Sequence, residues 1–324
     1  MKKRPLGTSG LEVSEIIFGC WQAGAGKEWP GVDDRESIAA MRAALDIGIN
    51  CFDTAEMYGH GHSEIIVAKA LEGMRHEVLL ASKVSPRHLR ADQVIEACHG
   101  SLKRLRTDYL DLYQIHWPSG SWGSDVVPIE ETMGAMVRLM ERGDIRAIGV
   151  SNFNAEEIEE ALQYGPIHSL QPPWSFFWPP YEYNGTIRTC IEHRIGVIAY
   201  SPLAQGLLAE RFGPDNRPPP EDNRSDNLLF QDPHYTHALE AVEAMKSIAR
   251  HYERPVSAIA LQWLLAQEGC TAAIVGAKRP DQIRAHRSAT DFTISSSDME
   301  ELSHIRQRVT SALPPDQTSP WPMS

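Results

Sequence analysis

The regular alternation of short apolar segments with amphipathic segments is the feature that most constrains the fold of this chain. The apolar segments have the length of strands, and the amphipathic segments repeat at helical spacing. Strands are expected at residues 16–18, 47–52, 78–82, 109–115, 147–150, 169–171, 197–200 and 272–275. Helices are expected at residues 33–47, 63–71, 92–105, 129–141, 155–162, 183–193, 238–251 and 256–266. Such alternation predicts a parallel sheet with helices packed around it.

The first expected strand is not followed by the Gly-rich GxGxxG turn of a doubly wound dinucleotide-binding sheet. This favours a closed barrel. Residues 3–13 are expected to form an N-terminal β-hairpin, and residues 298–309 a C-terminal helix. We therefore predict an α/β fold in which residues 1–324 form a single (β/α)8 TIM barrel domain.

The composition excludes several kinds of partner. A formal net charge of −12 argues against nucleic-acid and anionic-membrane partners, because neither surface attracts an acidic protein. No segment reaches a membrane-spanning length, and the basic start is not followed by the apolar part of a signal peptide. The five cysteines show no CxxC spacing, which indicates reduced thiols and no zinc site. We expect a cytoplasmic, metal-free protein that is a monomer or a weak homo-oligomer.

Polar side chains follow three successive expected strands. Asp53, Lys83 and His116 come at the ends of these strands, and Tyr58 lies in the loop after Asp53. Parallel barrels place their chemistry at these strand ends. A lysine held by the aspartate would lower the pKa of the phenol, which is ordinarily about 10. The histidine could polarise a carbonyl oxygen. This set predicts protonation of an oxygen that gains negative charge, as hydride reduction of a carbonyl requires.

Aromatic residues are frequent in the loops after strands. Core filling would scatter tryptophans among the helices, so we expect the loop tryptophans to form the walls of an aromatic pocket. They are Trp21, Trp29, Trp117, Trp122 and Trp178. The aromatic segment after Gln171 could shape the same pocket. The aperiodic segment 203–233 is long for a compact domain, which is typical of a functional or a disordered loop.

Several motifs in this order resemble those of the aldo-keto reductases. They are DTAEMYG at 53–59, Lys83 after a strand, IHWP at 115–118, GVSN at 149–152 and AYSPL at 199–203. The resemblance extends from the hairpin to residue 282 and implies an NADP(H)-dependent oxidoreductase that reduces an aldehyde or ketone to the alcohol. It also implies that Tyr58 is the general acid/base, that Lys83 and Asp53 are its partners, and that His116 orients the carbonyl.

The resemblance implies the cofactor and substrate contacts as well. Ser151, Asn152 and Gln171 would hold the nicotinamide carboxamide, and Tyr200 would stack on its ring. Segment 201–207 would wrap the pyrophosphate, and segment 276–282 would enclose the adenosine end at a helix N-terminus. The full set expected for NADP(H) is Trp21, Asp53, Ser151, Asn152, Gln171, Tyr200, Ser201, Leu203, Gln205, Gly206, Leu207, Gly276, Ala277, Lys278 and Gln282. The substrate set is Trp21, Tyr58, His116 and Trp117.

The charge needed by an anionic cofactor is expected at Lys278 and Arg279, just before Pro280. These two cations would read the 2′-phosphate of NADP(H). His286 departs from the family pattern, in which many relatives have an asparagine near the adenine.

Two other functions stay open. A regulatory protein of the same fold would bind the cofactor but turn over slowly. A metal-dependent isomerase or hydrolase on the same barrel is suggested by His60 and His62, although glycine-flanked histidines are usually loop residues and the carboxylate ligands are too few.

Overall fold

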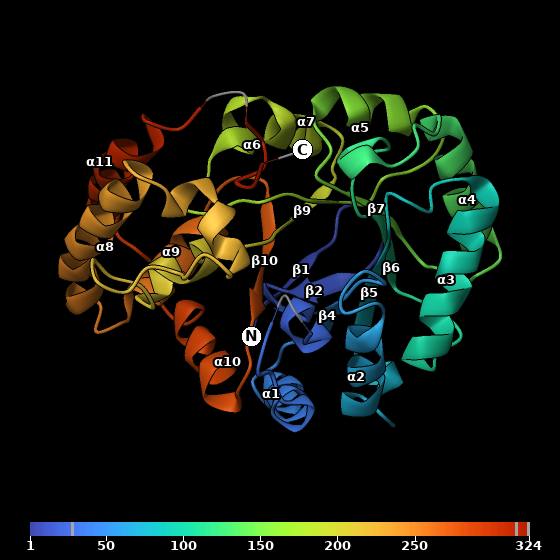
Figure 1. The fold of residues 1–324 in the computed structure, drawn as a ribbon, viewed down its shortest axis with the longest axis horizontal. Helices are drawn as coiled ribbons and strands as arrows, with labels where there is room; N and C mark the ends of the chain where they lie inside the picture. The colour runs from blue at the N-terminus through green and yellow to red at the C-terminus, as the bar shows by residue number, and fades with distance from the viewer. Residues whose placement is uncertain (27–28, 315–316, 323–324) are drawn as a thin grey trace.

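Eight parallel strands close into a barrel in the computed structural model, which describes residues 1–26, 29–314 and 317–322. The strands follow one another around the barrel in the order β10-β3-β4-β5-β6-β7-β8-β9. Helices form a ring outside them (Figure 1). The expected (β/α)8 TIM barrel is therefore confirmed.

The barrel strands are β3 (Ile16–Gly19), β4 (Cys51–Asp53), β5 (Leu79–Val84), β6 (Leu112–Ile115), β7 (Ile148–Ser151), β8 (Ser169–Gln171), β9 (Gly196–Ala199) and β10 (Cys270–Gly276). The helices are α1 (Asp34–Asp46), α2 (His62–Ala70), α3 (Ala91–Leu105), α4 (Ile129–Glu141), α5 (Ala155–Leu162), α6 (Pro180–Tyr183), α7 (Thr186–Glu192), α8 (His234–His251), α9 (Val256–Leu265), α10 (Pro280–His286) and α11 (Ser296–Thr310).

Short polar caps and one proline begin several of these helices. Asp33 accepts hydrogen bonds from the backbone N–H groups of Arg35 and Glu36 at the start of α1. Asn154 caps α5 in the same way. Pro280 occupies the first turn of α10, where its missing N–H has no intrahelical partner to lose. These starts place each helix directly after the loop that carries the preceding strand end.

The expected hairpin closes the N-terminal end of the barrel. β1 (Lys3–Pro5) pairs antiparallel with β2 (Glu12–Ser14). Leu6, Leu11 and Val13 of this hairpin join the apolar cluster that fills the barrel interior, together with Ile17, Cys51, Ala81, Leu112, Ala147, Ile198, Ala272 and Ile274. The lower barrel is thus solid, which leaves the carboxyl ends of the strands as the open end.

Side chains along a barrel strand alternate between the interior and the surrounding helices. In β4, Cys51 packs in the interior cluster, whereas Phe52 packs with the cluster between the sheet and the helices. Asp53 therefore returns to the interior one layer closer to the open end. This alternation, together with the solid layer below, fixes the height at which the polar residues meet.

Element boundaries differ from expectation at two places where glycine stops a pattern. The strand expected at 47–52 starts only at Cys51, because Ile47 caps α1 and Gly48 follows in a left-handed turn with φ 90°. The helix expected at 183–193 is α7, which begins only at Thr186, because Gly185 precedes it with φ 84° and Tyr183 ends the separate short helix α6.

The aperiodic segment 203–233 is ordered without long helices or strands. It contains the 3-10 helices η4 (Ala204–Ala209), η5 (Asn223–Asp226) and η6 (Leu228–Phe230). The C-terminal tail lies against it, because the backbone N–H of Leu228 donates to the carbonyl of Pro320 at 2.8 Å. Segment 203–233 and the tail, of which residues 317–322 are described after the gap, thus pack together as one layer.

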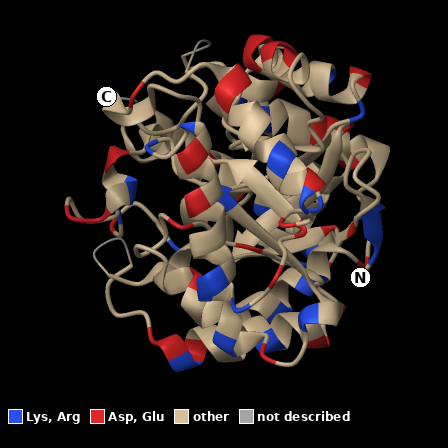
Figure 2. Ribbon diagram, turned by 90° about the vertical axis from the view of Figure 1, so that its right-hand side faces the viewer, with Lys and Arg blue, Asp and Glu red and all other residues tan. Residues whose placement is uncertain are grey.

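Charged residues are concentrated on the helices and loops around the barrel (Figure 2). All five cysteines are free and buried. Within the described residues, no helix is both long and apolar enough to cross a membrane.

Candidate active site

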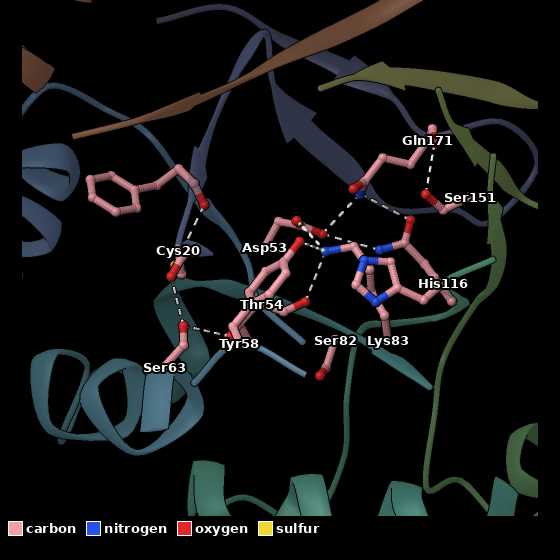
Figure 3. A network of polar contacts seen from close by, with 12 residues as sticks. Cys20, Asp53, Thr54, Tyr58, Ser63, Ser82, Lys83, His116, Ser151 and Gln171 are labelled. Carbon is pink, nitrogen blue, oxygen red and sulfur yellow. Dashed lines mark hydrogen bonds and ion pairs between the residues drawn. The ribbon is translucent and has the colours of Figure 1, made fainter. Parts of the chain in front are cut away.

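A chain of three polar groups crosses the open end of the barrel. Asp53 ends β4, and Lys83 lies in the neighbouring strand β5. The Nζ atom of Lys83 is 2.6 Å from Oδ2 of Asp53 and 3.1 Å from the hydroxyl oxygen of Tyr58. It also donates to the carbonyl of Thr54 at 2.9 Å. The structure therefore brings together three of the residues singled out from the sequence (Figure 3).

The loop that carries Tyr58 is fixed to its neighbours. A Cβ on Gly59 would lie 2.0 Å from the carbonyl oxygen of Gly24, so two backbones approach there closely. On the other side, Glu56 accepts hydrogen bonds from the backbone N–H of Ser85 at 2.7 Å and from the ring of His88 at 2.9 Å. The phenol is thereby held over Lys83 by contacts with two other loops.

Burial and the neighbouring groups together set the protonation of Lys83 and Tyr58. Burial lowers the pKa of Lys83, but Asp53 and Tyr58 together raise it by more than burial lowers it. The pKa therefore lies above its ordinary value, and the lysine is charged. For Tyr58, burial raises the pKa more than Lys83 lowers it, and the net pKa lies above 10.0. The expected lowering by Lys83 is present but is outweighed by burial. Tyr58 is therefore a neutral phenol beside a cation.

His116 follows β6 and faces the same space. Its ring centroid lies 5.6 Å from that of Tyr58, with the rings nearly perpendicular. Burial and the charge of Lys83 lower the pKa of His116 well below its ordinary value. A neutral imidazole carries one N–H, so His116 can donate a single hydrogen bond to an oxygen without adding charge.

A cavity of about 610 Å³ opens above these groups. Asp53, Tyr58 and His116 line it, together with Trp21 and Trp117. Lys83 is completely buried and does not line the cavity, but its partners Asp53 and Tyr58 both do. The wall of the cavity also includes Met57, Trp29, Trp122 and Trp321.

One of the five loop tryptophans was wrongly expected at the wall. Trp178 is 2% exposed, and its indole N–H donates to the carbonyl of Thr318 at 2.9 Å. The whole aromatic segment 174–178 is buried in the core and does not line the cavity. In its place the tail contributes Trp321, whose indole N–H donates to the carbonyl of Asn223 at 3.3 Å.

Three polar side chains lie together at the ends of β7 and β8. The hydroxyl of Ser151 donates to the backbone carbonyl of Gln171 at 2.8 Å. Asn152 donates to the carbonyl of His116 and to the hydroxyl of Ser151, at 3.0 Å each. Tyr200, at the end of β9, donates to Oδ1 of Asn152 at 2.9 Å. Asn152 adopts φ 64°, a left-handed conformation that asparagine tolerates better than most residues.

The segment after β9 has an unusual backbone. Ser201, Ala204 and Gln205 have φ values of 54°, 47° and 56°, and Gly206 follows with 107°. Such conformations persist only where the surrounding structure holds them, and they gather at ligand-binding sites. Of the residues expected to wrap the pyrophosphate, Ser201, Leu203, Gln205 and Gly206 line the cavity, whereas Leu207 is buried outside the lining.

A group of cations lies at another part of the cavity. Lys278 lines it with Arg211 and Arg224, two residues of segment 203–233 that the sequence analysis did not single out. Burial and the positive charges of Arg211 and Arg224 lower the pKa of Lys278. Trp29 covers the group, with its ring centroid 5.0 Å from Nζ of Lys278. The only sequence signal for the two arginines was their place in a long aperiodic segment.

Other residues of the expected adenosine end divide into two groups. Gly276 and Gln282 line the cavity, and Oε1 of Gln282 accepts from the backbone N–H of Lys278 at 2.8 Å. His286 also lines it, and burial lowers its pKa to about 4, so the ring is neutral. Ala277 is buried outside the lining. Arg279 is not part of the lining either, and its guanidinium pairs with Asp281 at 3.3 Å.

The two loop histidines do not form a metal-binding cluster. His62 pairs with Asp34 at 2.8 Å. In the part of the chain that the structure describes, no three His, Cys, Asp or Glu side chains are grouped so that they could hold a metal ion.

Comparison with known proteins decides the family. The family model described as "Aldo/keto reductase family" matches residues 15–307. This chain belongs to the aldo/keto reductase family. Among members of that family, it is 36% identical to the aldo-keto reductase YhdN of Bacillus subtilis (strain 168), over 96% of this chain and 95% of that protein.

Two further aldo/keto reductase relatives bear on the cofactor. The NADH-specific methylglyoxal reductase of Escherichia coli (strain K12) is 32% identical, over 95% of this chain and 100% of that protein. A crystal structure of an aldo-keto reductase from Klebsiella pneumoniae in complex with NADPH is 29% identical, covers 100% of both chains and has a TM-score of 0.76. The family therefore includes proteins with either nicotinamide cofactor.

Proposed function

We propose that this aldo/keto reductase is an NADP(H)-dependent oxidoreductase that reduces an aldehyde or ketone to the alcohol. One observation carries the proposal. A neutral phenol, Tyr58, lies 3.1 Å from a charged lysine that is paired at 2.6 Å with Asp53, at the floor of a large cavity. This arrangement delivers a proton to an oxygen on which negative charge develops.

The residues around the cavity fit a nicotinamide dinucleotide. Ser151, Asn152 and Gln171 offer a group of amide and hydroxyl partners near the phenol, suited to the carboxamide. Lys278, Arg211 and Arg224 offer a group of cations that Asp222, paired with Arg224, offsets only in part, and a polyanion would relieve the remaining repulsion. A bound reduced nicotinamide supplies the hydride. The protein supplies the remaining parts of the reaction, namely orientation of the carbonyl and the proton.

The roles of Tyr58 and His116 follow from their protonation. Tyr58 donates its proton to the carbonyl oxygen as that oxygen gains charge, and Lys83 stabilises the phenolate left behind. His116, being neutral, donates an N–H to the same oxygen and fixes its position without competing as an acid. Asp53 keeps Lys83 charged although the lysine is fully buried.

NADP(H) is favoured over NAD(H) by the cations. An extra phosphate on the adenosine needs charge-assisted donors, and Lys278, Arg211 and Arg224 gather three of them on one side of the cavity in a protein of net charge −12. A crystal structure of one family member contains NADPH, which supports this choice. The NADH-specific relative makes the cofactor the first point to test.

The apolar wall favours a neutral carbonyl compound. Near Tyr58 and His116 the cavity is lined by Trp21, Met57 and Trp117. Burying a carboxylate or phosphate against such a wall would cost free energy without a paired cation. We infer that uncharged aldehydes and ketones are better substrates than charged ones of equal size.

The proposal is tested with a panel of carbonyl compounds and both reduced cofactors, followed by the absorbance of the nicotinamide. The expected result is multiple turnovers, with a higher kcat/KM for NADPH than for NADH. Binding of NADPH without turnover for any reactive aldehyde would instead identify a cofactor-binding regulatory protein.

A further inference from the structure

Gln114 is a polar residue inside an otherwise apolar strand. In β6, Leu112 packs in the interior cluster and Tyr113 packs toward the helices, so Gln114 faces the barrel interior. Its side chain is completely buried. A buried amide needs partners, because an unpaired one costs about 1–3 kcal/mol. Its partners are Asp53 and Gln171, and Asp53 connects it to the active site.

Gln114 holds the oxygen of Asp53 that does not bind Lys83. Oδ2 of Asp53 accepts from Lys83, whereas Oδ1 accepts from Nε2 of Gln114 at 3.1 Å and from Nε2 of Gln171 at 3.0 Å. Oε1 of Gln114 in turn accepts from Nε2 of Gln171 at 3.2 Å. An ionised carboxylate can only accept, so both amide nitrogens must point toward it. These three hydrogen bonds therefore fix the orientation of the side chains of Asp53, Gln114 and Gln171 relative to one another.

The neighbouring strand leaves room for this side chain. Gly149 of β7 is paired with Gln114 in the sheet. A Cβ on Gly149 would lie 2.8 Å from Cγ of Gln114 and 2.4 Å from Oγ of Ser169. Any larger residue at 149 would thus push into Gln114. The side chain of Gln114 therefore fits only because residue 149 is a glycine.

We propose that Gln114 is a positioning residue for proton transfer. By anchoring Oδ1, it sets the plane of the Asp53 carboxylate so that Oδ2 faces Lys83. Lys83 then keeps its ammonium within 3.1 Å of the Tyr58 hydroxyl. The catalytic part of this inference rests on the proposed function. The contact between Gln114 and Asp53 stands independently of it.

The titratable groups around Asp53 define what a pH experiment would report. Lys83 and Tyr58 face it directly. The thiols of Cys20 and Cys51 are also close, and burial together with Asp53 raises their pKa values well above the ordinary range, so they are neutral. His116 is neutral as well, because burial and the charge of Lys83 lower its pKa well below the ordinary value. A new ionisation introduced at position 114 would therefore stand out at mildly acidic and neutral pH.

The decisive variant is Gln114→Glu. While protonated, the introduced carboxyl can donate to Oδ1 of Asp53 in place of the amide. Once ionised, it repels Asp53 at about 3 Å, and burial and this repulsion raise its pKa. We expect kcat near that of the wild type at low pH, then a new descending limb in kcat that ends in a loss of about tenfold or more. Gln114→Met, which has similar volume but no donor, should lose about tenfold in kcat at every pH without a new limb.

The matched control is Leu112→Met, which changes the same interior face of the same strand without touching Asp53. It should keep kcat within about twofold and retain the wild-type pH profile, as volume-conserving core changes do. For Gln114→Met, the KM for the carbonyl and the Kd for NADPH from tryptophan fluorescence should stay within about threefold. A loss in kcat alone marks positioning of the proton-transfer groups and not of the binding sites.

A second readout needs no turnover. The introduced carboxyl has a raised pKa in the folded state, so its unfavourable contribution is absent below its unfolded pKa of about 4.3 and grows as pH rises toward the folded pKa. The Tm of Gln114→Glu should therefore fall relative to that of the wild type across this interval, and the Tm of Gln114→Met should not.

The outcomes separate the two proposals. A wild type that oxidises neither cofactor with any carbonyl would overturn the proposed function, and the Tm measurement would still test the contact. An active wild type with an unchanged pH profile in Gln114→Glu would overturn the inference. So would a kcat for Gln114→Met within about twofold of the wild-type value, even if Gln114→Glu did not fold.

Discussion

The ammonium of Lys83 lies 2.6 Å from the carboxylate of Asp53, and neither group has more than 3% of its side chain exposed. Taking an ion pair out of water costs free energy that the attraction between the charges does not always repay. The burial of this ion pair is best explained by Tyr58, because Lys83 also contacts the hydroxyl of Tyr58 at 3.1 Å. Its charge is kept in the barrel to act on the phenol.

Replacing Tyr58 with Phe should remove the proton donor and keep the aromatic ring. We expect kcat to fall by about 10²–10⁴-fold, as is typical when a general acid is lost, with little change in NADPH affinity. Steady-state kinetics and a fluorescence titration of NADPH would measure both quantities. A variant that kept more than about half of the wild-type kcat would contradict the assignment of Tyr58.

Replacing Lys83 with Met should change the pH profile as well as the rate. Lys83 lowers the pKa of Tyr58 against the effect of burial, so without it the phenol should ionise at higher pH. Reduction requires the protonated phenol and is lost as pH rises through its pKa. The alkaline limb for reduction should therefore move upward from its position in the wild type, while kcat falls. A limb at the same pH in both proteins would show that Lys83 does not tune the phenol.

Cofactor choice should depend on Lys278 and Arg224 and not on Arg279. Charge-assisted hydrogen bonds contribute about 1.5–3 kcal/mol, so Lys278→Ala and Arg224→Ala should each weaken NADPH binding by about tenfold or more. Binding of NADH should change little. Arg279→Ala is the matched control, because Arg279 adjoins Lys278 in the chain but pairs with Asp281 outside the cavity.

Fluorescence titrations of the three variants with both cofactors would measure these effects. If Lys278→Ala and Arg224→Ala weakened NADPH and NADH binding equally, the cations would not read the extra phosphate. The sequence alone suggested that Arg279 would act in the same direction as Lys278. The expectation changes because Arg279 lies outside the cavity lining, whereas Arg224 lines the cavity.

Trp321 should affect the substrate more than the chemistry. It lines the cavity from the C-terminal tail and is tied to segment 203–233 through the carbonyl of Asn223. Trp321→Ala should raise the KM for bulky aromatic aldehydes by about tenfold, since a buried ring contributes a few kcal/mol of apolar contact, and leave kcat for a small aldehyde unchanged. Trp321→Phe keeps a ring without the N–H and should restore most of the difference. Equal KM values in all three proteins would show that Trp321 does not contact the substrate.

Local periodicity was sufficient to predict the barrel and the residues at the strand ends. Asp53 could be placed because a buried strand ends at a carboxylate, and parallel strands bring such ends together. Gln114 was missed although it carried a signal, namely an amide within the apolar run of β6 that needs buried partners. Its partners lie on β4 and β8, so only the closed barrel identifies them.

The errors concern segments whose direction no local pattern sets. Trp178 follows a strand like the other loop tryptophans, but its loop folds back into the core, and position after a strand did not reveal this. Arg211 and Arg224 belong to a segment without periodicity, and they reach the cavity through the left-handed turns after β9 and the path of η5. For Trp321, the tail must first dock on Leu228. These placements depend on long-range packing.

Within the described residues, the N-terminal hairpin packs Leu6, Leu11 and Val13 into the barrel below the polar layer, so the cavity opens at the carboxyl ends of the strands. Whatever enters the cavity must leave on the same side, past the layer formed by segment 203–233 and the tail. Two ligands that share this passage exchange in turn, so the one seated deeper has to arrive first and depart last. In the proposed reaction, we therefore expect the order in which the two ligands leave the cavity to influence turnover.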